Sequence, residues 1–343
     1  MPLSGASAGN VEGLVLNPAF AGLVSSYGPK DIGLSVHDLF PALTFTSNGN
    51  GTGFFQKYNL DENFQLLEDE DLIRRPASAA KKLNRSRRLE TFQVNKRHLD
   101  AVVPDDVAKV IRSQTGGADD PNVTEVMWVR QRLLLQKEKR AADLARASAS
   151  VAAELTPAHK WDDYTNGDPI ADIQSAMAAV RSNSGLIPNV VAIPWEVALK
   201  LSYHPRFRVA TPDGGSVRSA TERAIVTAEG IAELLKAILS VDKVVILKSM
   251  AQVGALARSH NLNLQSLWGD DVFVYFEPPK KDLNSILWAA DIMDTFYYGG
   301  VDTAGVFSFY DKDHEMMVHR VREDSDIILM HKEVAATIRD TLT

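Results

Sequence analysis

The chain has 343 residues, a formal net charge of -7 at pH 7 and no cysteine. The absence of cysteine excludes disulfides, thiolate nucleophiles and cysteine-ligated metals, and it fits folding in a reducing cytoplasm. The negative charge disfavours a polyanion-binding surface over the whole chain, and the length suggests two or so domains. No apolar run approaches the ~18 residues of a membrane span, and no secretion signal is expected.

Residues 1–38 are predicted to form an N-terminal arm, because glycine and proline recur too often for a stable core element. The apolar pieces Leu14–Leu16 and Phe20 offer contacts through which this arm could dock onto another surface. Simple terminal disorder is the alternative interpretation.

Residues 39–98 are predicted to form an extended, two-stranded loop. The stretches LTFTS and FFQKY favour strands, and the turn signal Asn48–Gly51 separates them. Further along this loop, residues 61–71 contain six acids and no base, whereas residues 74–97 contain nine bases and one acid. Few large apolar residues lie between Arg74 and Arg88, so this piece is expected to project from the core.

Three interpretations of this charged loop were compared. A nucleic-acid arm usually combines bases with stacking aromatics, but Phe92 is the one aromatic residue of the basic run, and the acidic run would repel the same polyanion. We favour docking of the loop onto a neighbouring copy, while a plain solvated loop remains possible. The candidate inter-subunit contacts are Asp69, Asp71, Arg74, Arg75, Lys81, Lys82, Arg85, Arg87 and Arg88.

Residues 99–165 are predicted to form a domain braced by one long helix at 122–150. Asp120 and Pro121 provide an N-cap and a helix start, and no glycine or proline follows until after Ser150. Lys139 and Asp143 form an i,i+4 pair on the expected exposed side. The expected buried stripe is Val126, Val129, Leu133, Leu134 and Leu144.

Residues 166–300 are predicted to form a second domain, and residues 301–343 to return as strands. Asp168–Pro169 starts a helix that ends at Gly185, PNVVAIP follows as a buried strand, and Pro194 starts another helix. GVFSFY and MMVHRV flank a turn at 311–314, and IILM is expected to form a last short strand. The whole pattern predicts a mixed α+β protein.

No motif points to catalysis. Gly5–Gly9 matches the nucleophile-elbow spacing but lacks the strand that must precede it. His314 and His319 are five residues apart on a predicted hairpin, so they would point to opposite faces and form no metal site. We therefore expect no enzyme activity, no catalytic residues, no metal and no cofactor.

The order of these features resembles the major capsid protein of tailed double-stranded DNA phages, which has the Hong Kong 97-type fold. RRPASAAK resembles the tip of the family's extended loop, and QRLLLQKEKRAADL resembles its long spine helix. The resemblance spans roughly residues 30 to 330. Its most specific part runs from 161 to 205 and matches at Trp161, Tyr164, Asp168, Pro169, Asp172, Ile173, Pro188, Asn189, His204 and Pro205.

The resemblance implies a shell subunit that forms pentamers and hexamers around packaged double-stranded DNA, without sequence-specific binding. Residues 99–165 would be the peripheral domain and residues 166–300 the axial domain. The loop would lie over an adjacent subunit, and the arm would reach a neighbour. The expected partners are a portal protein, a separate scaffold protein if there is one, and, as a further candidate, a decoration protein. Assembly is expected in the host cytoplasm, with a final location in the virion.

Two other interpretations remain open from the sequence. An encapsulin-like bacterial compartment protein would have the same fold and would enclose enzymes instead of a genome. An α/β enzyme of unknown substrate is the more remote alternative. No motif supports covalent crosslinking between subunits.

Overall fold

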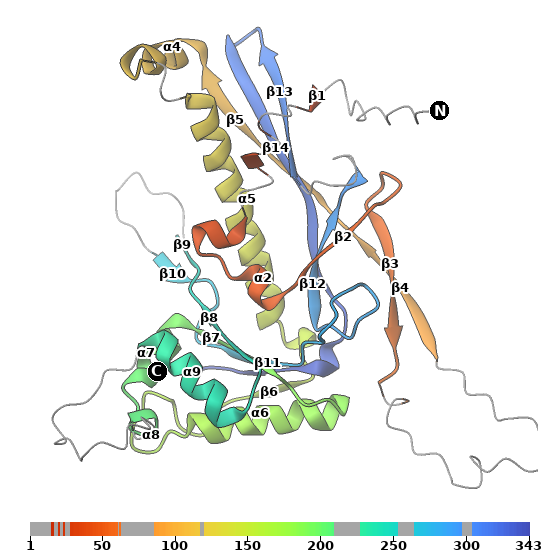
Figure 1. Cartoon of the computed structure of the whole chain (residues 1–343), viewed down its shortest axis with the longest axis vertical. Helices are drawn as coiled ribbons and strands as arrows, with labels where there is room; N and C mark the ends of the chain where they lie inside the picture. Colours follow the sequence, from red (N-terminus) through yellow and green to blue (C-terminus); the bar gives the residue numbers. More distant parts are fainter. Residues whose placement is uncertain are drawn as a thin grey trace, which may run out of the picture.

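The structure is a computed structural model that describes residues 15–16, 20, 23–24, 28–60, 62, 86–116, 120–208, 227–252, 264–296 and 304–343. The molecule is elongated, with a long helix and a sheet at one end and a cluster of shorter helices around a second sheet at the other (Figure 1). Among the described residues, no helix is long and apolar enough to cross a membrane.

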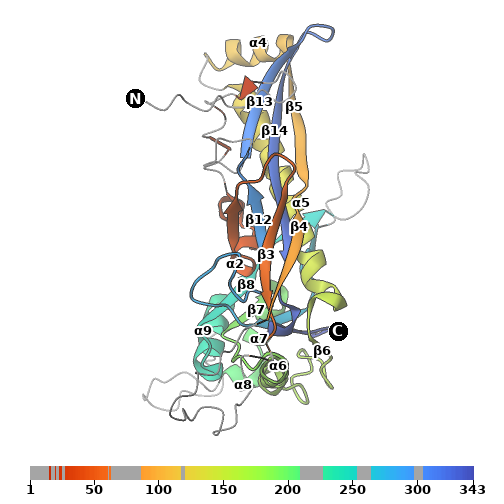
Figure 2. The same ribbon diagram turned by 90° about the vertical axis from the view of Figure 1, so that its right-hand side faces the viewer.

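One end of the molecule is a sheet on which the long helix α5 (Pro121–Arg146) packs. Strand β14 (Met316–Leu329) is the centre of this sheet, because it pairs with β13 (Ala304–Asp311), β5 (Lys96–Pro104) and β12 (Ala289–Asp294), all antiparallel. Figure 2 shows α5 running alongside β5 and β14. The short helix α4 (Asp105–Gln114) follows β5 at the far tip.

Helix α5 begins where the sequence predicts and ends earlier. The Asp120 side chain accepts from the backbone NH of Asn122, with Pro121 at the first helical position. The helix ends at Arg146 and not at residue 150, because Ala147 is extended and Ser148–Ser150 form the 3-10 turn η3. The Ser150 hydroxyl donates to the carbonyl of Ala147 at 2.6 Å, which stabilises the early end.

The strands predicted on the two sides of Asn48–Gly51 are confirmed, but they do not pair with each other. Strand β2 (Ala42–Phe45) pairs in parallel with β12, whereas β3 (Thr52–Tyr58) pairs antiparallel with β4 (Arg87–Gln93). The turn therefore joins two different sheets. The Asp294 carboxylate on β12 accepts from the backbone NH of Ser47 at 3.1 Å and fixes the point where the chain leaves the first sheet.

The other end of the molecule is a sheet with strand order β6-β15-β11-β7-β8. These strands are β6 (Ala153–Leu155), β15 (Ala335–Ile338), β11 (Val272–Tyr275), β7 (Val190–Pro194) and β8 (Lys243–Leu247). Helices α6 (Pro169–Ser184), α7 (Trp195–Ser202), α8 (Pro205–Arg208) and α9 (Ala228–Leu239) pack around it (Figure 1). Every residue of β7, β11 and β15 is buried, which explains their continuous apolar runs.

Helix α6 confirms its predicted boundaries. The Asp168 carboxylate accepts from the backbone NH of Ala171, and Gly185 ends the helix with a left-handed φ of 72°. The expected final strand IILM is wrong, because residues 327–329 continue β14 and the last strand is β15. A small ribbon of β9 (Met250–Gln252) and β10 (Leu264–Ser266) completes the second half.

The described parts of the predicted arm pack on their own chain. Strand β1 (Val15–Leu16) pairs with β13, and Val24 is fully buried in a cluster with residues of α5, β13 and β14. Residues 29–39 form the turn η1 (Pro29–Ile32) and the short helix α2 (Val36–Leu39), which lies against α5 (Figure 1).

Candidate assembly site

The ribbon of β3 and β4 has one face on the body and one face in solvent. Phe55 and Phe92 lie on the inner face, in an apolar cluster with Leu43, Ile292 and Met330. On the outer face, Phe54 is 62% exposed and Leu89 is 67% exposed, whereas Phe55 is only 2% exposed. This difference follows from the alternation of side chains along a strand.

Close packing under the ribbon requires Gly53. A Cβ atom at this position would lie 2.3 Å from the ring of Phe92, which is far inside van der Waals contact. The ribbon is a sheet of two strands, and no third strand among the described residues pairs with it. Two apolar side chains in water and two unpaired strand edges make the outer face suitable for contact with another protein surface.

Of the nine predicted contact residues, the structure places Arg87 and Arg88. They start β4, where Arg87 lies opposite Tyr58 and Arg88 opposite Lys57. Arg88 is exposed and its guanidinium lies 3.8 Å from the Glu90 carboxylate, a weak surface pair. The remaining predicted contacts lie outside the described residues: Asp69, Asp71, Arg74, Arg75, Lys81, Lys82 and Arg85.

A hollow of about 440 Å³ lies at the base of the ribbon. Its lining combines the bases Lys57, Arg87 and Arg88 with the acids Glu90 and Glu333. Because its lining contains charges of both signs, the hollow favours neither an anion nor a metal ion. Among the described residues, no group of three His, Cys, Asp or Glu side chains could hold a metal.

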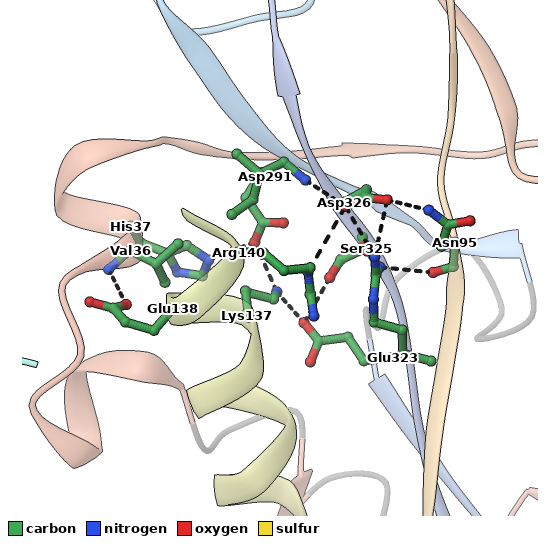
Figure 3. A network of polar contacts seen from close by, with 12 residues as sticks. Val36, His37, Asn95, Lys137, Glu138, Arg140, Asp291, Glu323, Ser325 and Asp326 are labelled. Carbon is green, nitrogen blue, oxygen red and sulfur yellow. Dashed lines mark hydrogen bonds and ion pairs between the residues drawn. The ribbon is translucent and has the colours of Figure 1, made fainter. Parts of the chain in front are cut away.

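A buried network of charges joins α5 to the strands behind it (Figure 3). Lys137 donates to the Asp291 carboxylate on β12 at 2.8 Å and also forms an ion pair with Glu323 on β14. Glu323 in turn pairs with Arg130, which lies seven residues, or about two turns, before Lys137 on the helix. At the rim, His37 of α2 lies 2.9 Å from the same Asp291 oxygen.

The pKa values of the two carboxylates fall in spite of their burial. Burial alone would raise the pKa of Glu323, but the charges of Arg130 and Lys137 outweigh it and hold the pKa well below its usual range. Burial also opposes ionisation of Asp291, and the charge of Lys137 together with the hydrogen bond from His37 lowers its pKa. Both groups are therefore ionised at neutral pH and stabilise their buried partners.

The neighbouring Glu138 connects three other segments. Its fully buried carboxylate accepts from the backbone NH groups of Ser35 and Val36, at 3.0 and 2.8 Å, and so caps the short helix α2. It also accepts from the Trp268 indole at 2.9 Å and from the Ser249 hydroxyl. Through Glu138, helix α5 thus holds both the start of α2, at the end of the predicted arm, and Ser249, just before β9.

Sequence reasoning did not find this network. The sequence analysis assigns Arg130, Lys137 and Glu138 to no buried position, because charged residues are rarely fully buried. Their partners lie far away in the sequence, with Asp291 separated from Lys137 by 154 positions. The one available signal is helical spacing, because Arg130, Leu133, Leu134, Lys137 and Ala141 follow the same buried stripe.

The sequence matches no protein-family model, and no curated protein sequence matches it. The fold is similar to a phage-related protein from Bordetella bronchiseptica RB50, with a TM-score of 0.66 over 96% of this chain and 98% of that chain, at 16% identity. It is also similar to a virus-like particle from Pyrococcus furiosus, with a TM-score of 0.51 over 93% and 96% of the two chains, at 12% identity.

These similarities define the class of the fold. The chain has the Hong Kong 97-like capsid fold, which confirms the α+β prediction and the resemblance.

Proposed function

We propose that this chain is a major capsid protein that assembles into pentamers and hexamers of an icosahedral shell around packaged double-stranded DNA. The outer face of the β3–β4 ribbon carries this proposal: Phe54 and Leu89 stand in solvent on a ribbon that is braced underneath by Phe55 and Phe92. An apolar surface on a stiff support is costly in an isolated chain and useful in an assembly.

The proposed partners follow from the same reasoning. The ribbon and the charged loop beyond it contact an adjacent copy, and the shell takes a portal protein and, where there is one, a separate scaffold and a decoration protein. The net charge of -7 suits a container that does not bind DNA tightly. Assembly takes place in the host cytoplasm, the final location is the virion, and no catalytic role is proposed.

Electron microscopy of the purified chain, with and without a co-expressed scaffold, tests this proposal. We expect closed, uniform particles. Particles that co-purify with an enzyme inside them would favour an encapsulin-like compartment instead. A monodisperse monomer or dimer under every condition, with a ligand in a pocket, would contradict shell assembly and favour the enzyme interpretation.

A further inference from the structure

The turn that leads from β2 into the ribbon contains two Asn-Gly pairs in a row, Asn48–Gly49 and Asn50–Gly51, and the chain has a third pair at Asn166–Gly167. An Asn-Gly pair is prone to attack of the backbone on its own side chain, because glycine has no side chain to keep its nitrogen away from the asparagine carboxamide. The surroundings of each pair decide which of the three asparagines can react.

The backbone NH of Gly49 donates to a hydroxyl that is itself bound to a carboxylate. It donates to Oγ of Ser47 at 3.0 Å, and the same hydroxyl donates to the Asp294 carboxylate at 2.5 Å. Ser47 is 5% exposed and Asp294 is 1% exposed, so bulk water does not compete for the bond between them. Together, Ser47 and Asp294 form a relay along which a proton can leave the Gly49 nitrogen.

The Asn48 side chain is free to approach this nitrogen. Asn48 is exposed, and its carboxamide has no hydrogen-bond partner among the described residues. The carboxamide can therefore turn toward Gly49 without breaking a bond to the protein. Its exposure also gives water access to the reacting carbon.

Asn50 shares the relay but cannot use it. The Gly51 NH also donates to Oγ of Ser47, at 3.3 Å, but Oδ1 of Asn50 accepts from the backbone NH of Thr52 at 3.0 Å. Gly51 is buried, and its carbonyl accepts from the Val94 NH at 2.8 Å. Both the carboxamide and the glycine of this pair are therefore held in place.

Asn166 is held in a similar way. Its Nδ2 donates to the Asp163 carboxylate at 2.9 Å, and the Gly167 NH donates to the Asp163 carbonyl at 2.8 Å. No carboxylate relay reaches the Gly167 nitrogen, because this NH is already bonded to a backbone carbonyl.

We propose that Asn48 is a self-modification site, at which the Gly49 nitrogen attacks the asparagine carboxamide with the Ser47–Asp294 relay as the base. A bond forms between this nitrogen and Cγ of Asn48, and the bond from Cγ to the side-chain nitrogen breaks. The Gly49 proton passes to Ser47 as the Ser47 proton passes to Asp294, and the relay then returns one proton to the leaving nitrogen, which departs as ammonia. Water opens the resulting five-membered imide at either carbonyl and gives aspartate or iso-aspartate, and no group is oxidised or reduced.

The product changes the turn in two ways. It adds a negative charge beside the Lys96 ammonium, which donates to the Gly49 carbonyl at 3.2 Å. The iso-aspartate form also adds one backbone carbon to the connection between β2 and the ribbon. The reaction needs a single chain, so it goes beyond the proposed function and does not depend on assembly.

Incubation of the full purified chain at neutral pH, followed by peptide mass spectrometry, tests the site. In the folded chain, Asn48 should lose ammonia at least about ten-fold faster than Asn50 and Asn166, with iso-aspartate among the products. In urea, where the relay is lost, the three asparagines should react at similar rates. A folded-state rate at Asn50 or Asn166 that equals the Asn48 rate would overturn the site. An Asn48 rate that is no higher in the folded chain than in urea would overturn the relay.

Ser47→Ala tests the relay directly, and Thr46→Ala is the matched control. Without the Ser47 hydroxyl, the Asn48 rate should fall at least about ten-fold and should rise more steeply with pH, because hydroxide must then act as the base. Asp294→Asn should behave like Ser47→Ala. Thr46 has the neighbouring hydroxyl of the same turn, but this hydroxyl bonds to Thr295 at 2.9 Å, so Thr46→Ala should keep the wild-type rate and pH profile. Circular dichroism checks that each variant is folded, and an unchanged rate and pH profile in folded Ser47→Ala would contradict the relay.

Discussion

Lys137 on the spine helix donates a hydrogen bond to Asp291 on β12 over 2.8 Å, and both side chains are fully buried. The pair links the long helix to the strand beside β14, and Glu323 extends the link to β14 itself. Removal of one partner of such a buried ion pair is strongly destabilising, because the other charge then stays buried with neither water nor an opposite charge to stabilise it.

Lys137→Met should therefore destabilise the chain by about 3–5 kcal/mol, since it leaves Asp291 charged and buried. Urea unfolding followed by circular dichroism measures this change. Lys139→Met is the matched control on the same helix: Lys139 is exposed and pairs with Asp143 at i,i+4, so its loss should cost less than about 0.5 kcal/mol. Equal costs for the two variants would contradict the assigned role of the network.

Glu138→Gln should loosen the end of the arm. The substitution removes the charge and one of the acceptor oxygens that serve Ser35, Val36, Ser249 and Trp268, so about 2–4 kcal/mol of stability should be lost. Hydrogen exchange should show faster exchange of the Ser35 and Val36 amides. Glu154→Gln, which affects an exposed pair with Arg339, should leave these amides unchanged.

Phe54 and Phe55 are neighbours in sequence with opposite roles, and this allows a matched comparison. Phe54→Ala should leave the free energy of unfolding within about 0.5 kcal/mol of the wild-type value, because Phe54 stands in solvent. The same substitution should abolish particle formation, because Phe54 belongs to the proposed contact surface. Phe55→Ala should cost about 3–5 kcal/mol, because it opens a cavity under the ribbon. Particle yield by electron microscopy and urea unfolding separate the two effects. A normal particle yield from Phe54→Ala would show that the outer face of the ribbon is not part of the assembly surface.

Reversal of the bases at the loop should block assembly without unfolding the subunit. In the variant Arg85→Glu, Arg87→Glu, Arg88→Glu, the charges that are proposed to meet an acidic neighbour change sign. The described members, Arg87 and Arg88, are exposed, so stability should change little. Sedimentation of the mixture measures particle yield. Wild-type yield would show that the loop docks without charge complementarity.

The elements with local signals were predictable from the sequence. Asp120 and Asp168 cap their helices, and Gly185 ends α6, because each acts on backbone groups a few residues away. The matched segment at 161–172 also has a local explanation: the Trp161 indole donates to Asp172 at 2.8 Å, and a Cβ atom at Gly167 would lie 2.6 Å from the carbonyl oxygen of Lys160.

The missed features depend on partners that are distant in sequence. Strand β12 reads AADIMD and contains two acids, so it lacks the pattern of a buried strand, yet all six of its residues are buried. Lys137 stabilises Asp291, and Ser47 donates to Asp294. Neither acid could be assigned to the interior before its partner was known. For the same reason, the pairing of β3 with β4 could not be predicted from the sequence, because the paired residues lie 29 to 41 positions apart.

The buried histidines predict a loss of stability in mild acid. Burial lowers the pKa of His331 below its ordinary value of 6.5, and burial also lowers the pKa values of His204 and His319. Nδ1 of His331 donates to the carbonyl of Leu287 at 3.3 Å, while its Nε2 is buried without a partner among the described residues. A second proton would therefore have no acceptor.

Below pH 6.5, the unfolded chain takes up protons at these histidines and the folded chain does not, so stability must fall as the pH falls. Each histidine can contribute up to about 1.4 kcal/mol per pH unit in this window. Urea unfolding at pH 7.5, 6.5 and 5.5 should show this decline, and His331→Gln should make it shallower. His314→Gln, at an exposed turn, is the control and should keep the wild-type slope. An unchanged slope in His331→Gln would mean that His331 takes up its proton in the folded chain as readily as in the unfolded one.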